Sequence, residues 1–583
     1  MITRSGHIDR VTRDRAQSHR AMWIGRLAPA ALAFVLALGL GCAQLHFLKS
    51  ASVPKRPGSS TTERGPAFSP ATSLVASLQP NAQEDWTTYN RTLSGERYAL
   101  AAAITPANAA TLQRVCTAPL GERAAFQAGP IAIGGTIYLT TATTTFALDA
   151  ENCALRWRHR YMYQPSPDFD LKVNRGVGYS DGRLFRGAND GRLYALDAAT
   201  GVELWNIVAG DVEKGETFPA APIAWGGLVY IGNAGGDNFG VVGRMMAFDV
   251  ASGGLVWSVP LVASAGDAAL SWPASTEVLP RAGGATWTSY SLDTLTHTLF
   301  IPTGNAAPDF LGAARPGDNF YTTSIVELDS RTGELRAAHQ LVKHDVHDWD
   351  VAAAPALVTT SRGRHLIIAG AKDGHVYGID RQSGEQRFRT AVTRIENIEA
   401  PFTAEGTRFC PGVNGGIEWN GPGFSPARNA VFVNSIEWCT TVKIGGVAQL
   451  TGKDALPWTG SAELRHPFGV QDSVSRGALT ALDADDGRIL WQFQAPTPLV
   501  AGVTPTAGGV VFTGDLAGTF YVFDAASGAV LFQDQTGAPI GGGVISYSRQ
   551  GRQYVAVAVG MHAPVTWRLK SPDARLIVYA LPR

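Results

Sequence analysis

An eleven-residue pattern recurs seven times along this chain and constrains its fold more than any other feature of the sequence. In its full form it reads small residue, any residue, Asp, three residues, Gly, three residues, aromatic residue, and some copies keep it only in part. The copies are ALDAENCALRW (147–157), ALDAATGVELW (195–205), AFDVASGGLVW (247–257), ELDSRTGELRA (327–337), GIDRQSGEQRF (378–388), ALDADDGRILW (481–491) and VFDAASGAVLF (522–532).

Each copy is typical of a tight connection between two strands. The aspartate side chain accepts backbone N–H bonds in the turn, and the glycine takes the positive-φ position that closes it. The aromatic side chain on the next strand presents a large flat surface to a neighbouring unit. A second hairpin precedes many copies, as at Asp190-Gly191. The repeat therefore predicts small antiparallel sheets with aromatic faces.

Such sheets bury both faces when they pack radially in a ring. We therefore expect an all-β fold, an eight-bladed β-propeller with tryptophan-docking-type repeats. Successive copies end 48, 52, 80, 51, 103 and 41 residues apart. The interval of 103 residues has room for an eighth unit, with strands from NAVFVNSIEWCTTV (429–442), and the interval of 80 carries an insertion. A solenoid is the competing architecture.

Composition supports a globular repeat protein. The chain has 583 residues, more than a single core usually holds, with 45% hydrophobic and 17% charged residues. Formal net charge is zero and no basic block occurs beyond the N-terminus, so the composition argues against a nucleic-acid-binding protein.

The N-terminal segment indicates export. A leader rich in arginine precedes the short apolar run Leu27–Ala43, which fits a signal peptide better than a spanning helix. Residues 1–43 are thus a cleaved signal, a lipoprotein signal at Cys42 or a retained membrane anchor, and each places the protein outside the cytoplasm. We expect a flexible linker over 44–83 and the propeller over 84–583.

Four cysteines besides Cys42 fit an oxidising compartment. Cys116, Cys153, Cys410 and Cys439 allow three pairings, and closeness in sequence favours 116–153 and 410–439. The alternative is four buried thiols. No CxxCH motif occurs, so no c-type haem is attached covalently to this chain.

Polar residues interrupt strand-like sequence in four places. Asp237 and Asn238 follow the glycines Gly235 and Gly236, which allow close approach of the backbone to a bound group. The other three are Asn305 in TGN, the acidic HDVHDWD (344–350) and Lys372 at a hairpin turn. Carboxylate and amide oxygens suit a hard cation, and lysine suits an anionic ligand. Each place taken alone is also compatible with an ordinary turn, and a zinc site at His344 and His347 lacks a third ligand.

At these residues the chain resembles the quinoprotein dehydrogenases that depend on pyrroloquinoline quinone (PQQ), the PQQ-dependent alcohol dehydrogenase family. The resemblance runs from DWTTYNRTLSGERYAL (85–100) to the C-terminus. Its most specific stretches are VNRGVGY (173–179), IPTGNAAPDF…RPGDNFYT (301–322), HDVHDWD, WNGPGFSP (419–426) and TAGGVVFTGDLAGTFYVFDAASG (506–528).

The resemblance implies roles for individual residues. Trp287 would form the floor under PQQ, and Arg175, Lys372 and Asn434 would contact the cofactor. Asn305 would bind the metal ion, Asp348 would be both catalytic base and metal ligand, and the Cys410–Cys439 disulfide matches one of the family. The implied reaction is oxidation of an alcohol or polyol by hydride transfer to PQQ.

Two departures from the family accompany this resemblance. Asp237 stands where the family has a metal-binding glutamate, so either Asp237 or Asn238 is the expected ligand. Many relatives have two adjacent cysteines where this chain has the residues around Phe169, and Phe169 would then cover the cofactor.

The family's lanthanide-using members carry an extra aspartate that matches Asp350, because a trivalent ion gains more from a further carboxylate than a divalent ion does. The metal is therefore expected to be Ca²⁺ or a lanthanide.

The expected function is that of a periplasmic enzyme that passes electrons to a separate cytochrome c or membrane quinone. A non-catalytic propeller scaffold, similar to outer-membrane assembly factors, is one alternative. A degenerate relative that binds PQQ poorly is the other.

Overall fold

A computed structural model of the protein describes residues 60–65, 80–81, 83–162, 172–454 and 456–583. The chain separates into the units Met1–Pro57 and Gly58–Arg583, and the fold belongs to the second. The predicted signal or anchor (1–43) and Phe169 lie outside the described residues. No helix in the described ranges combines the length and apolar character needed to cross a membrane.

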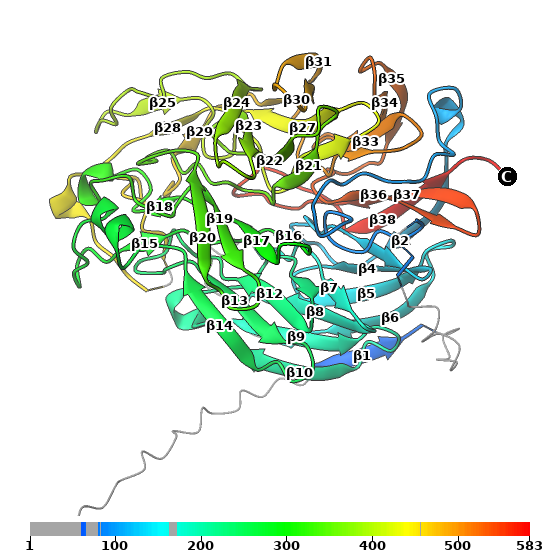
Figure 1. The fold of residues 1–583 in the computed structure, drawn as a ribbon, viewed down its shortest axis with the longest axis horizontal. Coiled ribbons are helices and arrows are strands. Elements are labelled where there is room, and N and C mark those ends of the chain that lie inside the picture. The colour runs from blue at the N-terminus through cyan, green and yellow to red at the C-terminus, as the bar shows by residue number, and fades with distance from the viewer. Residues whose placement is uncertain (1–59, 66–79, 82, 163–171, 455) are drawn as a thin grey trace, which may run out of the picture. The chain divides into compact units, whose positions relative to one another are not determined.

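The described chain is built from antiparallel sheets of four strands, and Figure 1 shows them following one another in chain order. Sheet one contains β3 (Ile131–Ile133), β4 (Thr136–Thr140), β5 (Thr144–Asp149) and β6 (Leu155–Arg160); sheet two contains β7 (Gly178–Ser180), β8 (Arg183–Gly187), β9 (Arg192–Asp197) and β10 (Glu203–Val208); and sheet three contains β11 (Ile223–Trp225), β12 (Leu228–Gly232), β13 (Arg244–Asp249) and β14 (Leu255–Pro260). Sheet four contains β16 (Ser291–Asp293), β17 (Thr298–Pro302), β19 (Ser324–Asp329) and β20 (Leu335–Gln340), and sheet five contains β21 (Ala356–Thr359), β22 (His365–Gly370), β23 (His375–Asp380) and β24 (Gln386–Ala391). Sheet six contains β26 (Gly423–Ser425), β27 (Ala430–Glu437), β30 (Arg476–Asp483) and β31 (Ile489–Ala495), and sheet seven contains β32 (Thr504–Pro505), β33 (Val510–Gly514), β34 (Thr519–Asp524) and β35 (Val530–Gln535).

The eighth sheet joins the two ends of the propeller. Strand β2 (Gln113–Pro119) pairs with β38 (Arg575–Ala580), which continues into β37 (Arg552–Val559) and β36 (Val544–Arg549). The innermost strands of successive sheets contact one another, as β7 does β11, β21 does β26 and β32 does β36. The sheets therefore form a ring, and their number fits the predicted eight blades.

The position predicted for the eighth unit was wrong. Residues 429–442 do not form a blade of their own, because β27 pairs directly with β30, the strand that carries the sixth copy of the repeat. The eighth sheet has no copy of the repeat, since its strands come from both ends of the propeller. The excess length between β24 and β30 instead holds a small sheet of β25 (Thr407–Phe409), β28 (Thr440–Val442) and β29 (Val470–Gln471).

The remaining short elements lie outside the eight sheets, except that β1 extends the first of them. β1 lies within the range expected to be a flexible linker, and it pairs with β6. These elements are β1 (Thr61–Arg64), β15 (Ala282–Gly283), β18 (Ala306–Ala307) and the 3₁₀ helices η1 (Ala109–Thr111), η2 (Val212–Lys214), η3 (Asp267–Ser271), η4 (Gly312–Ala314) and η5 (Val447–Gln449).

Copies of the repeat that end in tryptophan join a sheet to the next. The Asp197 side chain accepts the N–H of Thr200 at 2.8 Å, and Gly201 takes a φ of 72°. The Trp157 ring of the preceding sheet packs against this turn and donates its indole N–H to the carbonyl of Ala198 at 3.1 Å. A Cβ at Gly201 would lie 2.5 Å from that ring. The glycine is therefore needed both for its backbone conformation and for the space it leaves to the neighbouring tryptophan.

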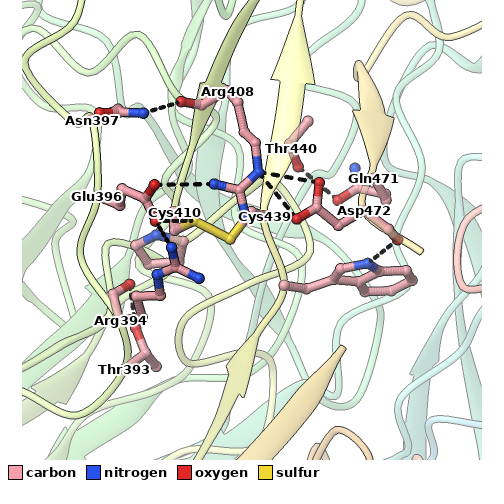
Figure 2. Close-up of a disulfide and its surroundings, with 12 residues drawn as sticks. Thr393, Arg394, Glu396, Asn397, Arg408, Cys410, Cys439, Thr440, Gln471 and Asp472 are labelled. Carbon is pink, nitrogen blue, oxygen red and sulfur yellow. Dashed lines mark hydrogen bonds and ion pairs between the residues drawn. A yellow bond between two sulfur atoms is a disulfide. The ribbon is translucent and has the colours of Figure 1, made fainter. Parts of the chain in front are cut away.

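Both predicted disulfides are present in the structure. Cys116 of β2 is bonded to Cys153 in the turn after β5, so this bond links the eighth sheet to the first. Cys410 and Cys439 are bonded beside the small sheet of the insertion, where Arg408 lies between Glu396 and Asp472 (Figure 2). The first bond fastens the point where the ring closes, and the second fastens the insertion.

Removal of the ring-closing disulfide is expected to destabilise the protein. The bond spans 37 residues, and losing the constraint it places on the unfolded chain costs about 2–4 kcal/mol. The double variant C116S/C153S should unfold at a lower urea concentration than the wild type. An unchanged midpoint would show that β2 is held by strand pairing and packing alone.

Candidate active site

The predicted metal-binding and catalytic residues, together with Lys372, lie in loops at one edge of the sheets. Neighbouring strands run antiparallel, so the segment before a sheet's first strand and the segment after its second strand lie at the same edge. Asp237 follows β12, Asn305 and Asp309 follow β17, Asp348 precedes β21, and Lys372 follows β22. The ring brings this edge of successive sheets together around its centre.

The loop before β21 holds alternate side chains on opposite sides. The Asp345 carboxylate accepts the backbone N–H groups of His347 (3.1 Å) and Trp349 (3.0 Å). The rings of His347 and Trp349 stack with centroids 4.1 Å apart and pack against Phe409 of the insertion. Asp348 has a φ of 62°, a conformation that Asp adopts more readily than most residues. The loop is therefore fixed on its aromatic side, and Asp348 lies on the other.

Lys372 joins the two aspartates of this loop. Its ammonium Nζ lies 3.0 Å from Oδ2 of Asp348 and 3.3 Å from Oδ2 of Asp350. The other oxygen of Asp350, Oδ1, accepts the backbone N–H of Asn305 at 2.9 Å. All four side chains are buried. Asp350 thus positions both the lysine and the backbone of the asparagine.

Three carboxylates converge beside this ion pair. Asp237, Asp309 and Asp348 each present one oxygen atom, and these atoms lie within 4.8 Å of one another. The Asn305 side chain lies beside Asp237 and moderates the rise in the pKa of that carboxyl, which is caused chiefly by burial. Oxygen ligands around one hard cation have this composition and spacing.

The negative charge of the cluster is only partly balanced. Burial, together with the neighbouring carboxylates, raises the pKa of Asp237 to about 6 and the pKa values of Asp309 and Asp348 well above their usual range. Burial alone would lower the pKa of Lys372, but Asp348 and Asp350 raise it well above its ordinary value. One lysine does not neutralise all of these carboxylates, so the remaining negative charge favours a bound cation.

An aromatic wall with unpaired donors is connected to the cluster through Glu418, which neighbours both Lys372 and Arg175. Arg175 donates to the carbonyl of Trp287 at 2.9 Å and to Oε1 of Gln127 at 2.6 Å. Its guanidinium carbon lies 4.5 Å from the ring centre of Trp287 and 5.7 Å from that of Trp419. Burial lowers the pKa of Arg175 to about 10, so it stays charged at neutral pH. Arg175 Nε and Gln127 Nε2 are buried without a hydrogen-bond partner within the described residues. The arrangement suits a flat anionic ligand.

Comparison with known proteins identifies the family. The family model described as "PQQ: Glucose/ethanol/alcohol dehydrogenase, beta-propeller domain" matches residues 86–392, more than half of the chain. This chain belongs to the PQQ glucose/ethanol/alcohol dehydrogenase family. The family and the propeller fold predicted from the sequence are thereby confirmed. A second model, "Outer membrane protein assembly factor BamB", matches residues 475–560, a part without the carboxylate cluster.

Relatives in this PQQ family cover most of the chain. The lanthanide-dependent methanol dehydrogenase of Methylacidiphilum fumariolicum is 28% identical over 523 residues, which are 82% of this chain and 84% of the relative. The quinoprotein ethanol dehydrogenase of Pseudomonas aeruginosa is 30% identical over 496 residues, 73% of this chain and 77% of the relative. A solved europium-containing methanol dehydrogenase superposes with a TM-score of 0.76 at 25% identity, covering 88% of this chain and all of that one.

The residues present fit the family's two bound groups. The cluster offers carboxylate oxygens to a metal ion, and in the part of the chain that the structure describes those of Asp309 have no hydrogen-bond partner. For PQQ, the half-buried Trp287 offers a flat surface, while Arg175 and Gln127 offer free donors at its edge.

Several other predicted site residues also make contacts within the protein. The amide nitrogen of Asn434 donates to the next sheet, at the carbonyl of Ala501 and at Thr513, while its Oδ1 is buried without a partner within the described residues. Asn238 donates its amide N–H to the carbonyl of Gly215 at 3.3 Å, and Asp237 joins the carboxylate cluster. The two glycines predicted to approach the cofactor, Gly235 and Gly236, pack against protein: a Cβ would lie 2.2 Å from the carbonyl of Gly215 at the first and 2.8 Å from the side chain of Ala285 at the second.

Three residues of the site were not singled out from the sequence. Asp309 and Gln127 are described above, and the third is Glu418, a buried acid whose neighbours include Lys372 and Arg175. Asp309 and Glu418 lie in or beside stretches that carry the family resemblance, but an acid in a loop has no local signature that separates a ligand from a turn.

Glu418 predicts a pH dependence of stability in the metal-free protein. Burial raises its pKa to about 7 from an ordinary value of 4.5, although Lys372 and Arg175 lower it. Between these values the folded state holds a proton that the unfolded state has released, so stability falls as pH rises. The variant E418Q should remove up to about 3 kcal/mol of the difference in unfolding free energy between pH 5 and pH 8. Urea titrations of the metal-free proteins at both pH values measure it, and an undiminished difference in E418Q would contradict the assignment.

Proposed function

We propose that this chain is a PQQ- and metal-dependent dehydrogenase that oxidises an alcohol or polyol. The observation that carries the proposal is the meeting of Asp237, Asn305, Asp348 and Lys372 beside the Arg175–Trp287 pair. Loops of separate sheets supply these side chains, and Lys372 balances only part of their buried negative charge, so a bound cation would offset the remaining cost. Of the proteins it resembles, one is a methanol dehydrogenase and another an ethanol dehydrogenase.

In this proposal Asp348 is the general base. Its carboxylate takes the proton of the substrate hydroxyl, and Nζ of Lys372, 3.0 Å from Oδ2, holds it oriented and favours its ionised form. The loop that carries Asp348 is kept rigid by the hydrogen bonds that the Asp345 carboxylate accepts from the backbone N–H groups of His347 and Trp349. The bond from Trp349 Nε1 to the carbonyl of Pro411 (3.1 Å) adds to this. When bound, PQQ supplies the acceptor for the hydride, and Ca²⁺ or a lanthanide supplies polarisation of the accepting carbonyl.

The cellular setting follows from the sequence. The N-terminal export segment and the two disulfides support a periplasmic enzyme, held there as a soluble protein or by an N-terminal anchor. Because the chain has no CxxCH motif, its electrons would pass to a separate cytochrome c or to a membrane quinone.

Purified protein supplied with PQQ and either Ca²⁺ or La³⁺ tests the function. We expect an absorbance band of bound quinone and dye reduction with at least one member of a panel of alcohols, polyols and aldehydes. Absence of bound quinone would favour a propeller scaffold, and bound quinone without oxidation would favour a degenerate relative. Equal or better activity with Ca²⁺ would reject a preference for lanthanides.

A further inference from the structure

Asp309 is a fully buried carboxylate without a hydrogen-bond partner. Its side chain follows β18 and has no exposed surface, and neither of its oxygens has a partner within the described residues. The nearby Arg315 does not supply one, because it donates to the carbonyls of Pro308 and Asp309 and to the side chain of Asn319. An uncompensated carboxylate in such a place is costly, so its position calls for a ligand.

The carboxylate is aimed at two others. One oxygen each of Asp309, Asp237 and Asp348 lies within 4.8 Å of the others. Calcium and similar ions bind oxygen at about 2.3–2.6 Å, so two ligands on opposite sides of an ion are about 4.6–5.2 Å apart. The three oxygens are thus close enough to share one ion.

Asp350, the acid predicted to favour a lanthanide, is differently engaged. Its Oδ1 accepts the backbone N–H of Asn305 and its Oδ2 lies 3.3 Å from Nζ of Lys372. In the structure, therefore, the third carboxylate of the cluster is Asp309, while Asp350 accepts from the backbone of Asn305 and shares Lys372 with Asp348.

We propose that Asp309 is a direct ligand of the metal ion and makes this site selective for trivalent lanthanides. The inference rests on the proposed function, since it requires that the cluster holds the ion. The four aspartates Asp237, Asp309, Asp348 and Asp350 together with Lys372 carry a net charge of –3, which a trivalent ion balances, whereas with Ca²⁺ one negative charge would remain buried. Because Coulomb attraction scales with ionic charge, loss of the Asp309 carboxylate weakens the binding of a trivalent ion more than the binding of a divalent ion.

Europium luminescence measures the affinity and the hydration of the bound ion without any need for catalysis. Full-length protein stripped of metal is titrated with Eu³⁺ and, by competition, with Ca²⁺, for the wild type and for D309N. We expect D309N to bind Eu³⁺ roughly 100-fold more weakly and Ca²⁺ roughly 20-fold more weakly. The Eu³⁺ lifetimes in H₂O and D₂O should show additional bound water in the variant, and D309E should recover much of the affinity.

The matched control is D515N. Asp515 is equally buried, but it accepts hydrogen bonds from Thr519 (2.8 Å) and Tyr521 (3.0 Å) in a hairpin outside the cluster. Its variant should bind Eu³⁺ as the wild type does. If D309N keeps wild-type Eu³⁺ affinity and hydration, the inference is overturned, and a raised KM in that variant would assign Asp309 to substrate binding. If the wild type binds neither ion, the proposed function fails as well.

Discussion

Replacement of Asp348 by asparagine is expected to lower kcat for alcohol oxidation by about 10²–10⁴-fold. The amide cannot take the hydroxyl proton, and it is a weaker ligand for the metal ion than the carboxylate. Asparagine is the informative choice because it tolerates the left-handed backbone that Asp348 adopts at a φ of 62°, which alanine would strain. Steady-state dye reduction by the protein loaded with PQQ and metal gives the value.

Two controls separate loss of the base from loss of the fold. D515N changes a buried aspartate of another sheet and should leave kcat unchanged. Circular dichroism and the urea midpoint of D348N should match the wild type to within the effect of a single buried substitution. Retention of more than a tenth of wild-type kcat would show that another group takes the proton.

The repeat made the propeller predictable from sequence. The copies encode contacts within a few residues, as between Asp197 and Thr200, and those that end in tryptophan also encode a contact with the next sheet. Local contacts of this kind produce a repeating pattern in the sequence. The eighth sheet has no such pattern, because β2 and β38 come from opposite ends of the propeller and their pairing depends on the closed ring.

The site was predictable only in part, for a related reason. Asp348 and Lys372 were identified because their stretches resemble the family, and the structure brings them within 3.0 Å. Asp309 follows a proline in a loop, where a lone aspartate is typical of a turn. Its proximity to Asp237 is set by the ring rather than by either local sequence, so no pattern along the chain could show it. The cofactor contact of Asn434 stays a prediction from its motif: its amide nitrogen bonds to the next sheet, and its Oδ1 has no partner among the described residues.

Lys372→Met is expected to destabilise the metal-free protein by about 3–5 kcal/mol. The substitution keeps an unbranched chain of similar length but leaves Asp348 and Asp350 buried without their cation, and Glu418 loses a favourable neighbour. A trivalent ion at the adjacent carboxylates would supply the missing positive charge. Saturating La³⁺ should therefore stabilise the variant more than it stabilises the wild type, as urea midpoints with and without the ion would show. Equal stabilisation of both proteins would mean that the lysine and the ion do not share these carboxylates.

A double-mutant cycle with D350N tests the same electrostatics by a route independent of the metal. If the lysine mainly balances Asp350, removing both charges should cost less than the sum of the single variants, by an interaction energy of about 1–3 kcal/mol. If it mainly holds Asp348, to which its Nζ is nearer by 0.3 Å (3.0 against 3.3 Å), the two substitutions should be closer to additive in stability. K372R, which keeps the charge on a bulkier fork, should retain more stability than K372M and still oxidise alcohol more slowly than the wild type, because the guanidinium cannot hold the Asp348 carboxylate in the same place.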